Sequence, residues 1–492
     1  MSFRVDWRVS CRLVGTVLKW LWVPLLLPLG IALYDGTPIV PFILPILGTG
    51  FLGWRLEQLT EKRDLRTREA FLMVSLTWLS IALVGSTPFL LAGEGVLAQP
   101  VNALFESMSG ITTTGATVIV NFEHHSRAVL MWRAVLQWLG GLGILVLATA
   151  ILSQLSVGGA QLMETETQTQ DVNKLTPRIS ETAALLWKIY IGLTGLQVAV
   201  LYGLHWVGLA PEMTLYDAIA HAFTTISTSG FSPRAESIAA FSPAVQWAII
   251  PFMMIGATSF VLLYFVLQGN VERLRNSDEF RFYIGILGVF TGGISGVLLI
   301  DASLYGNLEE ILRHSLFQVV SIITTTGYSS TDFNLWSPGA KQLLFICMFI
   351  GGMAGSTTCS IKTLRWLVVL KSFRRDLFVA TIPSAIRPVR LSGSVVDEET
   401  IRDIYSYTLV SLVVFVIATI FVVVDASRVR LMVTEFEAMS AAAATFFNVG
   451  PAFGIAGPLE SYEAFPWSTK LTMIFLMWIG RIEIIPVLVL TL

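Results

Sequence analysis

The sequence predicts an all-α integral membrane protein, on the basis of its composition, the length of its apolar segments and the distribution of basic residues between them. The chain has 492 residues, of which 54% are hydrophobic and only 13% are charged. Globular chains average about 25% charged residues, because a soluble domain must cover its surface with polar side chains. A soluble enzyme, a secreted scaffold and a disordered chain are therefore disfavoured. The net charge of −2 argues against a nucleic-acid partner, which would require a basic surface.

The three cysteines indicate neither a disulfide framework nor a zinc site. Their number is odd, and Cys11, Cys347 and Cys359 form no CxxC pair and no Cys/His cluster.

Ten segments are apolar enough to be expected as membrane-spanning helices, which need roughly 20 residues to cross a hydrocarbon core of ~30 Å. The first follows three arginines but is longer than the apolar part of a signal peptide, so it is predicted to be a retained span. The ten segments are Leu13–Leu33, Ile39–Trp54, Phe71–Ala92, Val129–Leu152, Ala183–Val207, Ala244–Leu267, Phe282–Ile300, Leu343–Leu370, Ile404–Val424 and Leu471–Leu492.

The basic residues of the loops predict the orientation. If the N-terminus is cytoplasmic, the inner segments hold 19 Lys and Arg and the outer segments hold 6. Cytoplasmic loops of membrane proteins carry such an excess. Both termini are therefore expected in the cytoplasm.

Four segments between the predicted spans are too short and too polar to cross the membrane, and they resemble one another. Each is a helical stretch followed by a turn rich in Thr, Ser or Asn around one glycine, and all four lie on the predicted outer side. They read FESMSGITTTGATV (105–118), HAFTTISTSGFSP (221–233), LFQVVSIITTTGYSS (316–330) and AAAATFFNVGPAFG (441–454). The repeated unit is a helix, a re-entrant half-helix with its loop, and a second helix. Four such units follow an N-terminal helix pair.

Polar residues recur at fixed distances before the four glycines. They lie thirteen residues before (Asn102, Asp217, His314 and Glu437), and nine before in three of the four copies (Glu106, His221 and Gln318, with Ala441 in the fourth). Two interpretations are open: these side chains tie the half-helices to the outer boundary, or they attract cations.

The four loops predict a pore. Irregular backbone at membrane depth leaves N–H and C=O groups unpaired unless it is buried in protein or lines a water-filled path. Glycine permits positive φ, which lets consecutive carbonyls point the same way, and Thr and Ser hydroxyls add oxygens that replace the hydration shell of a cation. No carboxylate stands in the loops themselves, which favours a monovalent ion over Ca²⁺.

The motifs ITTTGATV, STSGFS, TTTGY and NVGPAFG, in this order, resemble the Trk/Ktr/HKT superfamily of potassium transporters, and the N-terminal pair resembles its Trk type. The resemblance implies a pseudo-fourfold pore and places its filter at Thr113, Thr114, Gly115, Thr228, Ser229, Gly230, Thr325, Thr326, Gly327, Asn448, Val449 and Gly450. In this superfamily a serine at the first filter glycine is associated with sodium preference. Gly115 therefore favours potassium, whereas the fourth loop departs from the others by carrying Asn-Val.

The eighth predicted span has a run of small residues in its middle, from Gly351 to Ser360. Three glycines make a poor helix interior, each costing about 0.8–1.0 kcal/mol relative to alanine. One interpretation is close helix packing of the Gly351-xxx-Gly355 kind. The other is an unwound plug beneath the filter, which the resemblance implies, with gate residues Gly351, Gly352, Gly355, Ser356 and Lys362. Cys359 and Ser360 depart from the glycine-rich family pattern.

Arg481 lies inside the last predicted span, where a charge costs about 2.5–3.5 kcal/mol and should face a cavity or a partner. Glu483 is not expected to pair with it, because residues two apart on a helix do not face each other. The resemblance implies that Arg481 projects toward the conduction path and acts as a gate residue.

The function predicted is potassium uptake through a gated, K⁺-selective pore driven by the membrane potential, and the protein is not predicted to be an enzyme. A H⁺- or Na⁺-coupled symporter is the alternative, although no chain of buried acidic or histidine residues is evident beneath the filter. An intramembrane serine protease built on Ser229 and His221 is disfavoured, because the other repeats do not preserve that pair.

The resemblance implies a homodimer in the bacterial inner membrane, with cytoplasmic RCK-type regulatory subunits that bind NAD(H), ATP or ADP. This chain has no nucleotide-binding motif and is expected to bind K⁺ as the transported ion and no organic cofactor. The expected divisions are 1–69 for the N-terminal pair and 70–152, 153–268, 269–371 and 372–492 for the four repeats.

Overall fold

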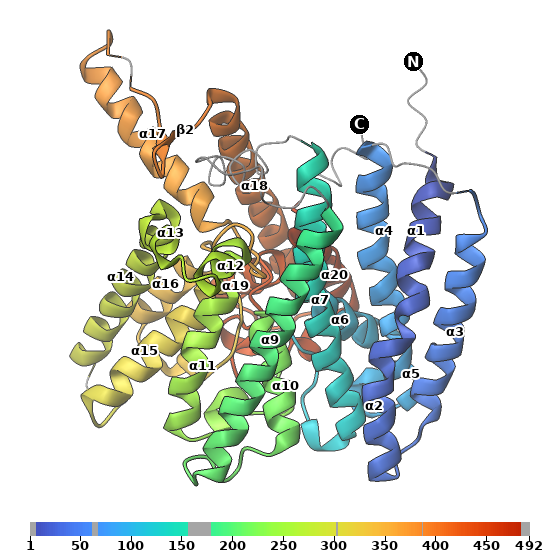
Figure 1. Ribbon diagram of the computed structural model, residues 1–492. Coiled ribbons are helices and arrows are strands. Elements are labelled where there is room, and N and C mark those ends of the chain that lie inside the picture. Colours follow the sequence, from blue (N-terminus) through green and yellow to red (C-terminus); the bar gives the residue numbers. More distant parts are fainter. Residues whose placement is uncertain (1–5, 62–66, 156–178, 302–303, 386, 484–492) are drawn as a thin grey trace.

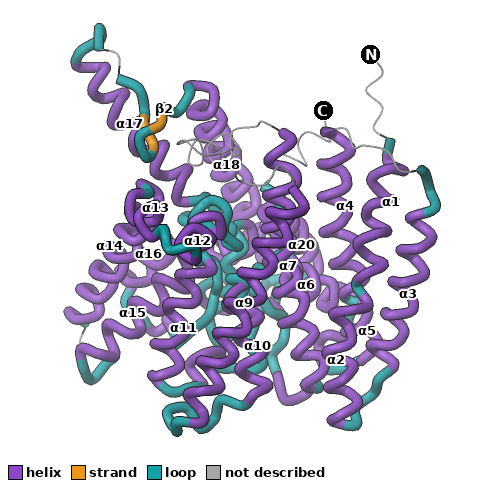
Figure 2. The backbone as a smooth tube through the Cα atoms, in the orientation of Figure 1, coloured by secondary structure: helices purple, strands orange, loops and turns teal. Residues whose placement is uncertain are grey.

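A computed structural model describes residues 6–61, 67–155, 179–301, 304–385 and 387–483 of the chain. The described part is a shell of long helices around an interior that contains short helices and loops (Figures 1 and 2). The all-α membrane fold class predicted from the sequence is confirmed. The one sheet among the described residues is a two-residue antiparallel pairing of β1 (Arg390–Leu391) with β2 (Ser394–Val395), between two long helices.

The N-terminal part forms a layer on one side of the shell (Figure 1). The first predicted span is two helices that meet at Leu21, and the second is one helix that starts with a proline in its first turn. Proline fits there because the N–H it lacks would have no partner in the helix. The helices are α1 (Trp7–Trp20), α2 (Trp22–Asp35) and α3 (Val40–Glu57).

Four successive units follow, each with a short helix between longer ones. The first is α4 (Thr67–Gly85), α5 (Thr87–Ala92), α6 (Pro100–Ile111) and α7 (Arg127–Leu155). The second is α9 (Ile179–Trp206), α10 (Leu215–Ile226), α11 (Pro243–Gly256) and α12 (Phe260–Leu267). The third is α14 (Asp278–Ile300), α15 (Leu308–Ile323), α16 (Pro338–Cys347) and α17 (Thr363–Thr381), preceded by the short α13 (Val271–Asn276). The fourth is α18 (Glu398–Arg428), α19 (Glu435–Phe446) and α20 (Trp467–Arg481).

The half-helices α6, α10, α15 and α19 begin at strong start signals. Pro100 opens α6, and Thr214 and Asn307 cap α10 and α15 through their side chains. Thr434 and Glu437 form a reciprocal capping box at the start of α19. Such caps satisfy backbone N–H groups that a helix start leaves unpaired. Short 3₁₀ turns lie between the longer elements: η1 (Gly95–Ala98), η2 (Phe122–His124), η4 (Ser237–Ala240), η5 (Phe333–Leu335), η6 (Gly454–Ala456) and η7 (Tyr462–Ala464).

The sixth predicted span is sharply bent. The segment Ala244–Leu267 was expected to cross the membrane as one helix, but α11 and α12 meet at an angle of 105°. The break lies at Ala257–Ser259, where backbone groups bond to the third unit: Ala257 O accepts from Met353 N, and Phe260 N donates to Gly355 O. Tertiary hydrogen bonds thus replace helical ones at the break.

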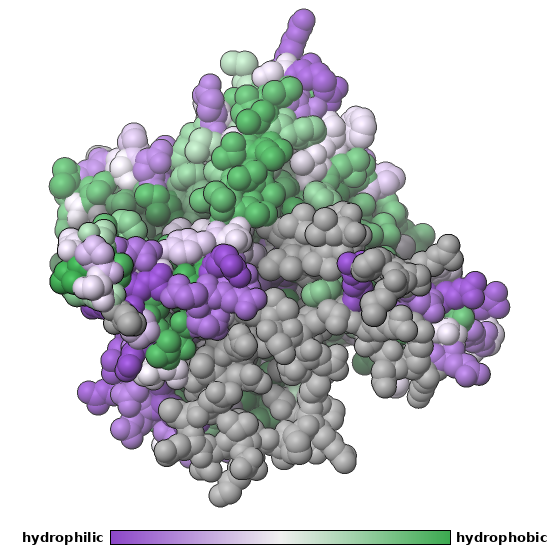
Figure 3. All heavy atoms as spheres, turned by 90° about the horizontal axis from the view of Figure 1, so that it is seen from above, coloured by the Kyte–Doolittle hydropathy of each residue, from purple (hydrophilic) through white to green (hydrophobic). Residues whose placement is uncertain are grey.

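By length and hydropathy, six helical segments of the described chain could cross a membrane, or seven if α11 and α12 count as one bent span. The other three predicted spans correspond to α3, to the interrupted α16 and α17, and to α20, and their crossing stays a prediction. The last predicted span extends to Leu492, and residues 484–492 lie outside the described part. Figure 3 looks onto the face where α1 begins and shows a broad band of apolar side chains along one flank.

Candidate ion pathway

Each of the four half-helices ends in the same turn. In all four, the second residue after the helix is not glycine and yet has positive φ: Thr113 (55°), Thr228 (51°), Thr325 (51°) and Asn448 (54°). The next N–H reaches back five residues, as from Thr114 N to Ser109 O (2.9 Å). This is the left-handed end of a helix, in which late N–H groups satisfy carbonyls that the helix leaves unpaired. We call residues 112–115, 227–230, 324–327 and 447–450 the filter loops.

The four filter glycines close the loops into a ring. A Cβ on Gly115 would lie 2.3 Å from the carbonyl oxygen of Ser229, so glycine is required by contact as well as by its φ of 82°. The same relation links each loop to the next in chain order and the fourth back to the first. The other distances from such a Cβ are 1.8 Å from Gly230 to Thr326 O, 2.2 Å from Gly327 to Val449 O and 2.6 Å from Gly450 to Thr114 O.

Hydroxyl pairs brace three of the four loops. The Thr112 and Thr114 hydroxyls are 2.8 Å apart, and the equivalent pairs are Ser227 with Ser229 (2.5 Å) and Thr324 with Thr326 (2.7 Å). The fourth loop has Phe447 and Val449 at these positions and therefore lacks the pair. The fourth loop therefore differs from the other three in its bracing as well as in its sequence.

The polar residues that precede the glycines tie each half-helix to the segment after its filter loop. Glu106 accepts a hydrogen bond from Val118 N (2.9 Å), His221 bonds Ser232 Oγ (3.0 Å), and Gln318 donates to Ser330 Oγ (3.3 Å). In the fourth unit, where position 441 is alanine, Ser440 accepts from Phe453 N (3.0 Å). These contacts hold each half-helix against the chain that follows its filter loop, and a role of these residues at the outer boundary or in attracting cations stays a prediction.

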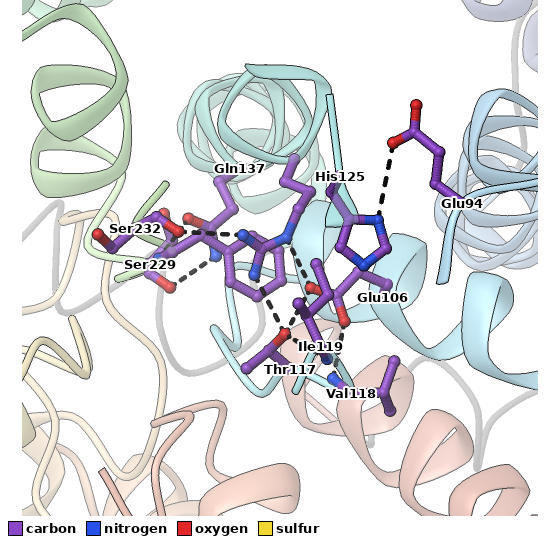
Figure 4. Close-up of polar contacts among 11 residues, drawn as sticks. Glu94, Glu106, Thr117, Val118, Ile119, His125, Gln137, Ser229 and Ser232 are labelled. Atoms are coloured by element: carbon purple, nitrogen blue, oxygen red, sulfur yellow. Dashed lines mark hydrogen bonds and ion pairs between the residues drawn. The ribbon is translucent and has the colours of Figure 1, made fainter. Parts of the chain in front are cut away.

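A buried ion pair anchors the first unit beside the ring. Arg133 on α7 and Glu106 on α6 are 1% and 0% exposed at their side chains and 2.7 Å apart. Arg133 also donates to Ser232 O (3.0 Å) and Thr117 Oγ1 (3.2 Å), so one side chain bonds the segments that follow two filter loops. Figure 4 shows Glu106, Thr117 and Ser232 converging on this cluster.

Gln137 joins the first two units directly at the filter. Its amide nitrogen donates to Ser229 O (2.7 Å), and its amide oxygen accepts from Phe231 N (2.9 Å), on either side of Gly230 (Figure 4). Neither Arg133 nor Gln137 was among the functional residues predicted from the sequence. A charge inside a predicted span, Val129–Leu152, was the signal that could have identified Arg133.

A cavity of about 100 Å³ opens onto the ring from one side. All four filter glycines line it, together with Arg133 of α7 and residues of the segments that follow the filter loops, including Arg234 and Glu460. Arg234 is paired with Asp217 at 2.7 Å. The cavity therefore has the position of a vestibule to the ring.

The eighth predicted span is interrupted between α16 and α17. Residues 348–362, which we call the plug segment, are not helical, so the interpretation of Gly351 and Gly355 as a helix-packing pair is wrong. Gly355 has a φ of 74°, and a Cβ on Gly352 would lie 2.8 Å from Ala257 O. The plug segment thus needs glycine both for its conformation and for its close contact with Ala257, the residue that follows α11.

Hydrogen bonds hold the plug segment against neighbouring elements and also link its own residues. Thr357 Oγ1 donates to Gly256 O (3.0 Å), and Glu279 of α14 accepts from Ala354 N (2.7 Å). Ser356 donates to Met353 O (2.6 Å), and Lys362 Nζ donates to Thr358 Oγ1 (3.0 Å). Gly351 N donates to Ile361 O (2.8 Å), which closes the base of the segment.

The plug segment touches the filter loops through their left-handed residues. Thr228 Oγ1 lies 3.1 Å from Thr357 Oγ1, and Thr325 Oγ1 accepts from Cys359 N at 3.0 Å. Thr113 Oγ1 lies 3.9 Å from Cys359 Sγ. Three of the four loops therefore rest directly on the plug segment.

Arg481, at the end of α20, is 2% exposed and bonds the plug segment. Its Nη1 lies 3.0 Å from Thr357 O and 2.7 Å from Cys359 Sγ, and its Nη2 donates to Gly140 O (3.0 Å). Glu483 does not pair with Arg481, as expected, and instead bonds Arg365 of α17 at 2.5 Å. The guanidinium thus bridges α20, α7 and the plug segment.

His221 and Ser229 do not form a nucleophile and base. His221 contacts Asp217 O and Ser232 Oγ, whereas the Ser229 hydroxyl bonds Ser227 and Thr224 O. No group of three or more His, Cys, Asp or Glu side chains among the described residues could hold a metal ion.

Comparison with known proteins extends over almost the whole chain. The profile of the TrkH family, described as a cation transport protein, matches residues 42–287 and 305–492. The chain is 36% identical to the Trk system potassium uptake protein TrkH of Halomonas elongata, with 98% of each chain covered. It is 33% identical to the protein of that name from Escherichia coli K12, over 94% of this chain and 96% of the relative. The crystal structure of the potassium transporter TrkH from Vibrio parahaemolyticus matches with a TM-score of 0.88 and 32% identity, over 99% of both chains. These relatives are transport proteins, so the prediction that the chain is not an enzyme is confirmed.

Proposed function

Because the chain belongs to the TrkH family of cation transport proteins, we propose that it takes up K⁺ through a gated pore driven by the membrane potential. It is a multi-pass membrane protein, and its relatives are named for potassium uptake. The proposal assigns ion selection to the four filter loops and gating to the plug segment with Arg481.

The ring of four glycines is the observation that carries the proposal. Each loop alternates a left-handed residue, a residue of negative φ and a left-handed glycine, as in Thr113, Thr114 and Gly115. Such alternation turns successive carbonyls toward one side, and a ring of carbonyls can replace the water shell of K⁺. The partly negative C-terminal ends of the four half-helices lie at the same place and favour a cation there.

The charges around the ring favour a monovalent ion. No carboxylate stands in the filter loops, and Glu106, on the half-helix before the first loop, is paired with Arg133. A Ca²⁺ site would be expected to include Asp or Glu carboxylates among its oxygen ligands. All four filter glycines are present, which in this family favours potassium over sodium.

Arg481 supplies the barrier of the gate in this proposal. Its guanidinium is buried beneath the ring and bound to the plug segment at Thr357 and Cys359. A fixed positive charge in a low-dielectric path repels cations strongly. Opening therefore requires that the plug segment and Arg481 move apart or aside.

The remaining assignments concern the assembly. We propose cytoplasmic termini, a homodimer in the bacterial inner membrane, repeats bounded at 70–152, 153–268, 269–371 and 372–492, and RCK-type subunits that bind NAD(H), ATP or ADP. The name of the relatives refers to a system, which supports partner subunits. The tip formed by α17 and the β1–β2 hairpin projects from the face where α1 begins and is a natural contact for such subunits (Figure 1).

Uptake of ⁸⁶Rb⁺ into proteoliposomes that contain K⁺ tests the proposed ion. We expect external K⁺ to compete strongly with ⁸⁶Rb⁺ and external Na⁺ to compete weakly. Equal competition by Na⁺ would retain the pore and remove the potassium assignment. Uphill K⁺ movement driven by a proton or sodium gradient at zero K⁺ gradient would instead establish the coupled symporter.

The substitution Arg481→Ala tests the gate. We expect basal ⁸⁶Rb⁺ uptake to rise about tenfold, because about 1.4 kcal/mol of barrier corresponds to a factor of ten. Arg481→Lys keeps the charge and is expected to keep most of the barrier. Unchanged basal and regulated uptake in Arg481→Ala would remove the barrier role.

A further inference from the structure

Asn448 occupies, in the fourth filter loop, the position that threonine occupies in the other three. All four residues have φ between 51° and 55° and are fully buried. Asparagine tolerates this left-handed conformation better than most residues. The backbone is therefore the same in the four loops, and the side chain is what differs.

The side chain of Asn448 makes two bonds that have no equivalent at the three threonines. One is to another filter loop, and the other is to the helix that follows its own loop. Its amide nitrogen donates to Thr114 Oγ1 at 2.8 Å and to Met477 O at 2.9 Å. The carbonyl of Met477 can only accept, so the atom that faces it is the amide nitrogen. One amide group thus joins the first filter loop, the fourth filter loop and α20.

The bond to Met477 leads directly to the gate. In an α-helix the carbonyl of residue 477 accepts the N–H of residue 481, and α20 ends at Arg481. Arg481 in turn binds Thr357 O and Cys359 Sγ of the plug segment. A continuous series of hydrogen bonds therefore runs from the Thr114 hydroxyl through Asn448 and the end of α20 to the plug segment.

The end of α20 is also packed tightly against the fourth loop. A Cβ on Gly480 would lie 1.9 Å from Phe446 O and 2.7 Å from the amide oxygen of Asn448. That amide oxygen is buried and has no hydrogen-bond partner in the described part of the chain. A displacement of Gly480 and Arg481 cannot occur without changing the position of the Asn448 side chain.

We propose that Asn448 is a positioning residue that couples the state of the gate to ion selection in the filter. When Arg481 leaves the plug segment, the end of α20 moves, and Asn448 transmits that movement to the hydroxyl of Thr114. The ring then has different selectivity in the closed-gate and open-gate arrangements. This inference rests on the proposed function, since it requires both a selective filter and a gate at Arg481.

A double-mutant cycle between positions 448 and 481 tests the coupling. The full-length protein is reconstituted in planar bilayers, and the K⁺/Na⁺ permeability ratio is measured from reversal potentials. The four forms are the wild type, Arg481→Ala, Asn448→Thr and the double variant. Threonine is accepted at this φ in the other three loops, but its hydroxyl carries one proton and is shorter, so it cannot donate to both Thr114 and Met477.

We expect Arg481→Ala to change the permeability ratio when residue 448 is asparagine and to leave it unchanged when residue 448 is threonine. The rise in flux caused by Arg481→Ala persists in both. The permeability ratio of the double variant is expected to differ by about fivefold or more from the value that the two single effects together would give. Fivefold is the lower end of ordinary coupling between sites. If the permeability ratio of the double variant equals the product of the two single effects to within about twofold, the inference is overturned, because independent sites behave that way.

Asn448→Asp is the second variant, because it keeps the shape of the side chain and replaces the donor to Met477 by an oxygen that cannot donate. It is expected to abolish the coupling as Asn448→Thr does. Gln197→Met is the matched control: Gln197 is a buried amide of α9 with no hydrogen-bond partner for either amide atom in the described part of the chain. It is expected to leave the effect of Arg481→Ala on the ratio unchanged.

The failures can be told apart. A wild-type protein without K⁺ preference would remove the proposed function, and this inference with it. This inference alone would be removed by a different result. In that result the wild type prefers K⁺ and flux rises in Arg481→Ala, but the substitutions at 448 and 481 affect the permeability ratio independently.

Discussion

The filter loops and the plug segment are both irregular backbone inside the helical shell, yet they are held in different ways. Each filter loop is held by bonds to its own half-helix, and three of the four have an internal hydroxyl pair. The plug segment is held by single bonds to many elements, among them α11, α14 and α20. Local bonds that repeat within one turn produce a rigid unit, whereas dispersed bonds can be exchanged when neighbouring helices move. In the proposed function, the locally braced loops select the ion, and the segment held by dispersed bonds forms the gate.

The largest effect is expected from opening the ring. Gly230→Ala places a Cβ 1.8 Å from Thr326 O at a φ of 73°, so either the second or the third loop must shift. We expect ⁸⁶Rb⁺ uptake to fall at least tenfold and K⁺ preference to be lost. Gly192→Ala on α9 is the control, because a Cβ there meets no atom within 4 Å. Normal uptake by Gly230→Ala would show that the loops are not a rigid unit.

The next effect concerns the anchor of the ring. Glu106→Gln leaves Arg133 buried without its counter-charge and is expected to lower the free energy of unfolding by about 3–5 kcal/mol. Thermal unfolding in detergent measures the loss. The double variant Glu106→Gln with Arg133→Met should recover most of it, because no unpaired charge remains.

The exposed pair Lys19–Glu57 provides the contrast, with side chains 45% and 23% exposed. Lys19→Met is expected to cost about 0–1 kcal/mol, since solvent screens such a pair. Equal losses at the two sites would mean that Arg133 and Glu106 do not stabilise the ring by a buried charge pair.

A smaller effect is expected from loosening the plug segment. Ser360 donates to Met348 O at 2.8 Å, and Ser360→Ala removes that bond without altering the filter loops. A hydrogen bond contributes about 1 kcal/mol, so basal ⁸⁶Rb⁺ uptake should rise about fivefold while K⁺ preference is unchanged. Ser427→Ala on α18 removes a bond of the same length to Val423 O and should change neither quantity.

The smallest effect is expected within a filter loop. Thr326→Val gives the third loop the side chain that the fourth loop has at Val449, and it removes the bond to Thr324. The backbone carbonyl and the glycine remain, so the K⁺/Na⁺ ratio should change no more than about threefold. A tenfold change would show that the hydroxyl pair determines selectivity and that the fourth loop works differently from the others.

The conformation of the filter loops could be predicted from the sequence because its requirements are local. A glycine after Thr, Ser or Asn at the end of a half-helix records the backbone conformation directly, and Gly115, Gly230, Gly327 and Gly450 all have positive φ. The interruption at Gly351 and Gly355 was detectable for the same reason. A position that requires positive φ restricts the residue type, so the requirement can be recognised in the sequence.

Contacts between distant segments could not be predicted. The pairing of Arg133 with Glu106 and the bond from Asn448 to Met477 depend on how helices of different units pack. The break between α11 and α12 was missed because Ala257, Thr258 and Ser259 are compatible with a helix and become irregular only through bonds to the plug segment. Sequence patterns carry little information about partners of this kind.

The central claim is that the glycine ring selects the ion, and Gly115→Ser tests it most directly. The serine side chain would enter the ring beside the carbonyl of Ser229, where a Cβ lies at 2.3 Å. The measurement is ⁸⁶Rb⁺ uptake into K⁺-loaded proteoliposomes with K⁺ or Na⁺ as competitor, for the wild type, Gly115→Ser and the control Gly192→Ser. We predict that Na⁺ competes weakly in the wild type and the control and about as well as K⁺ in Gly115→Ser. A Gly115→Ser protein that transports normally and keeps its K⁺ preference would contradict the account.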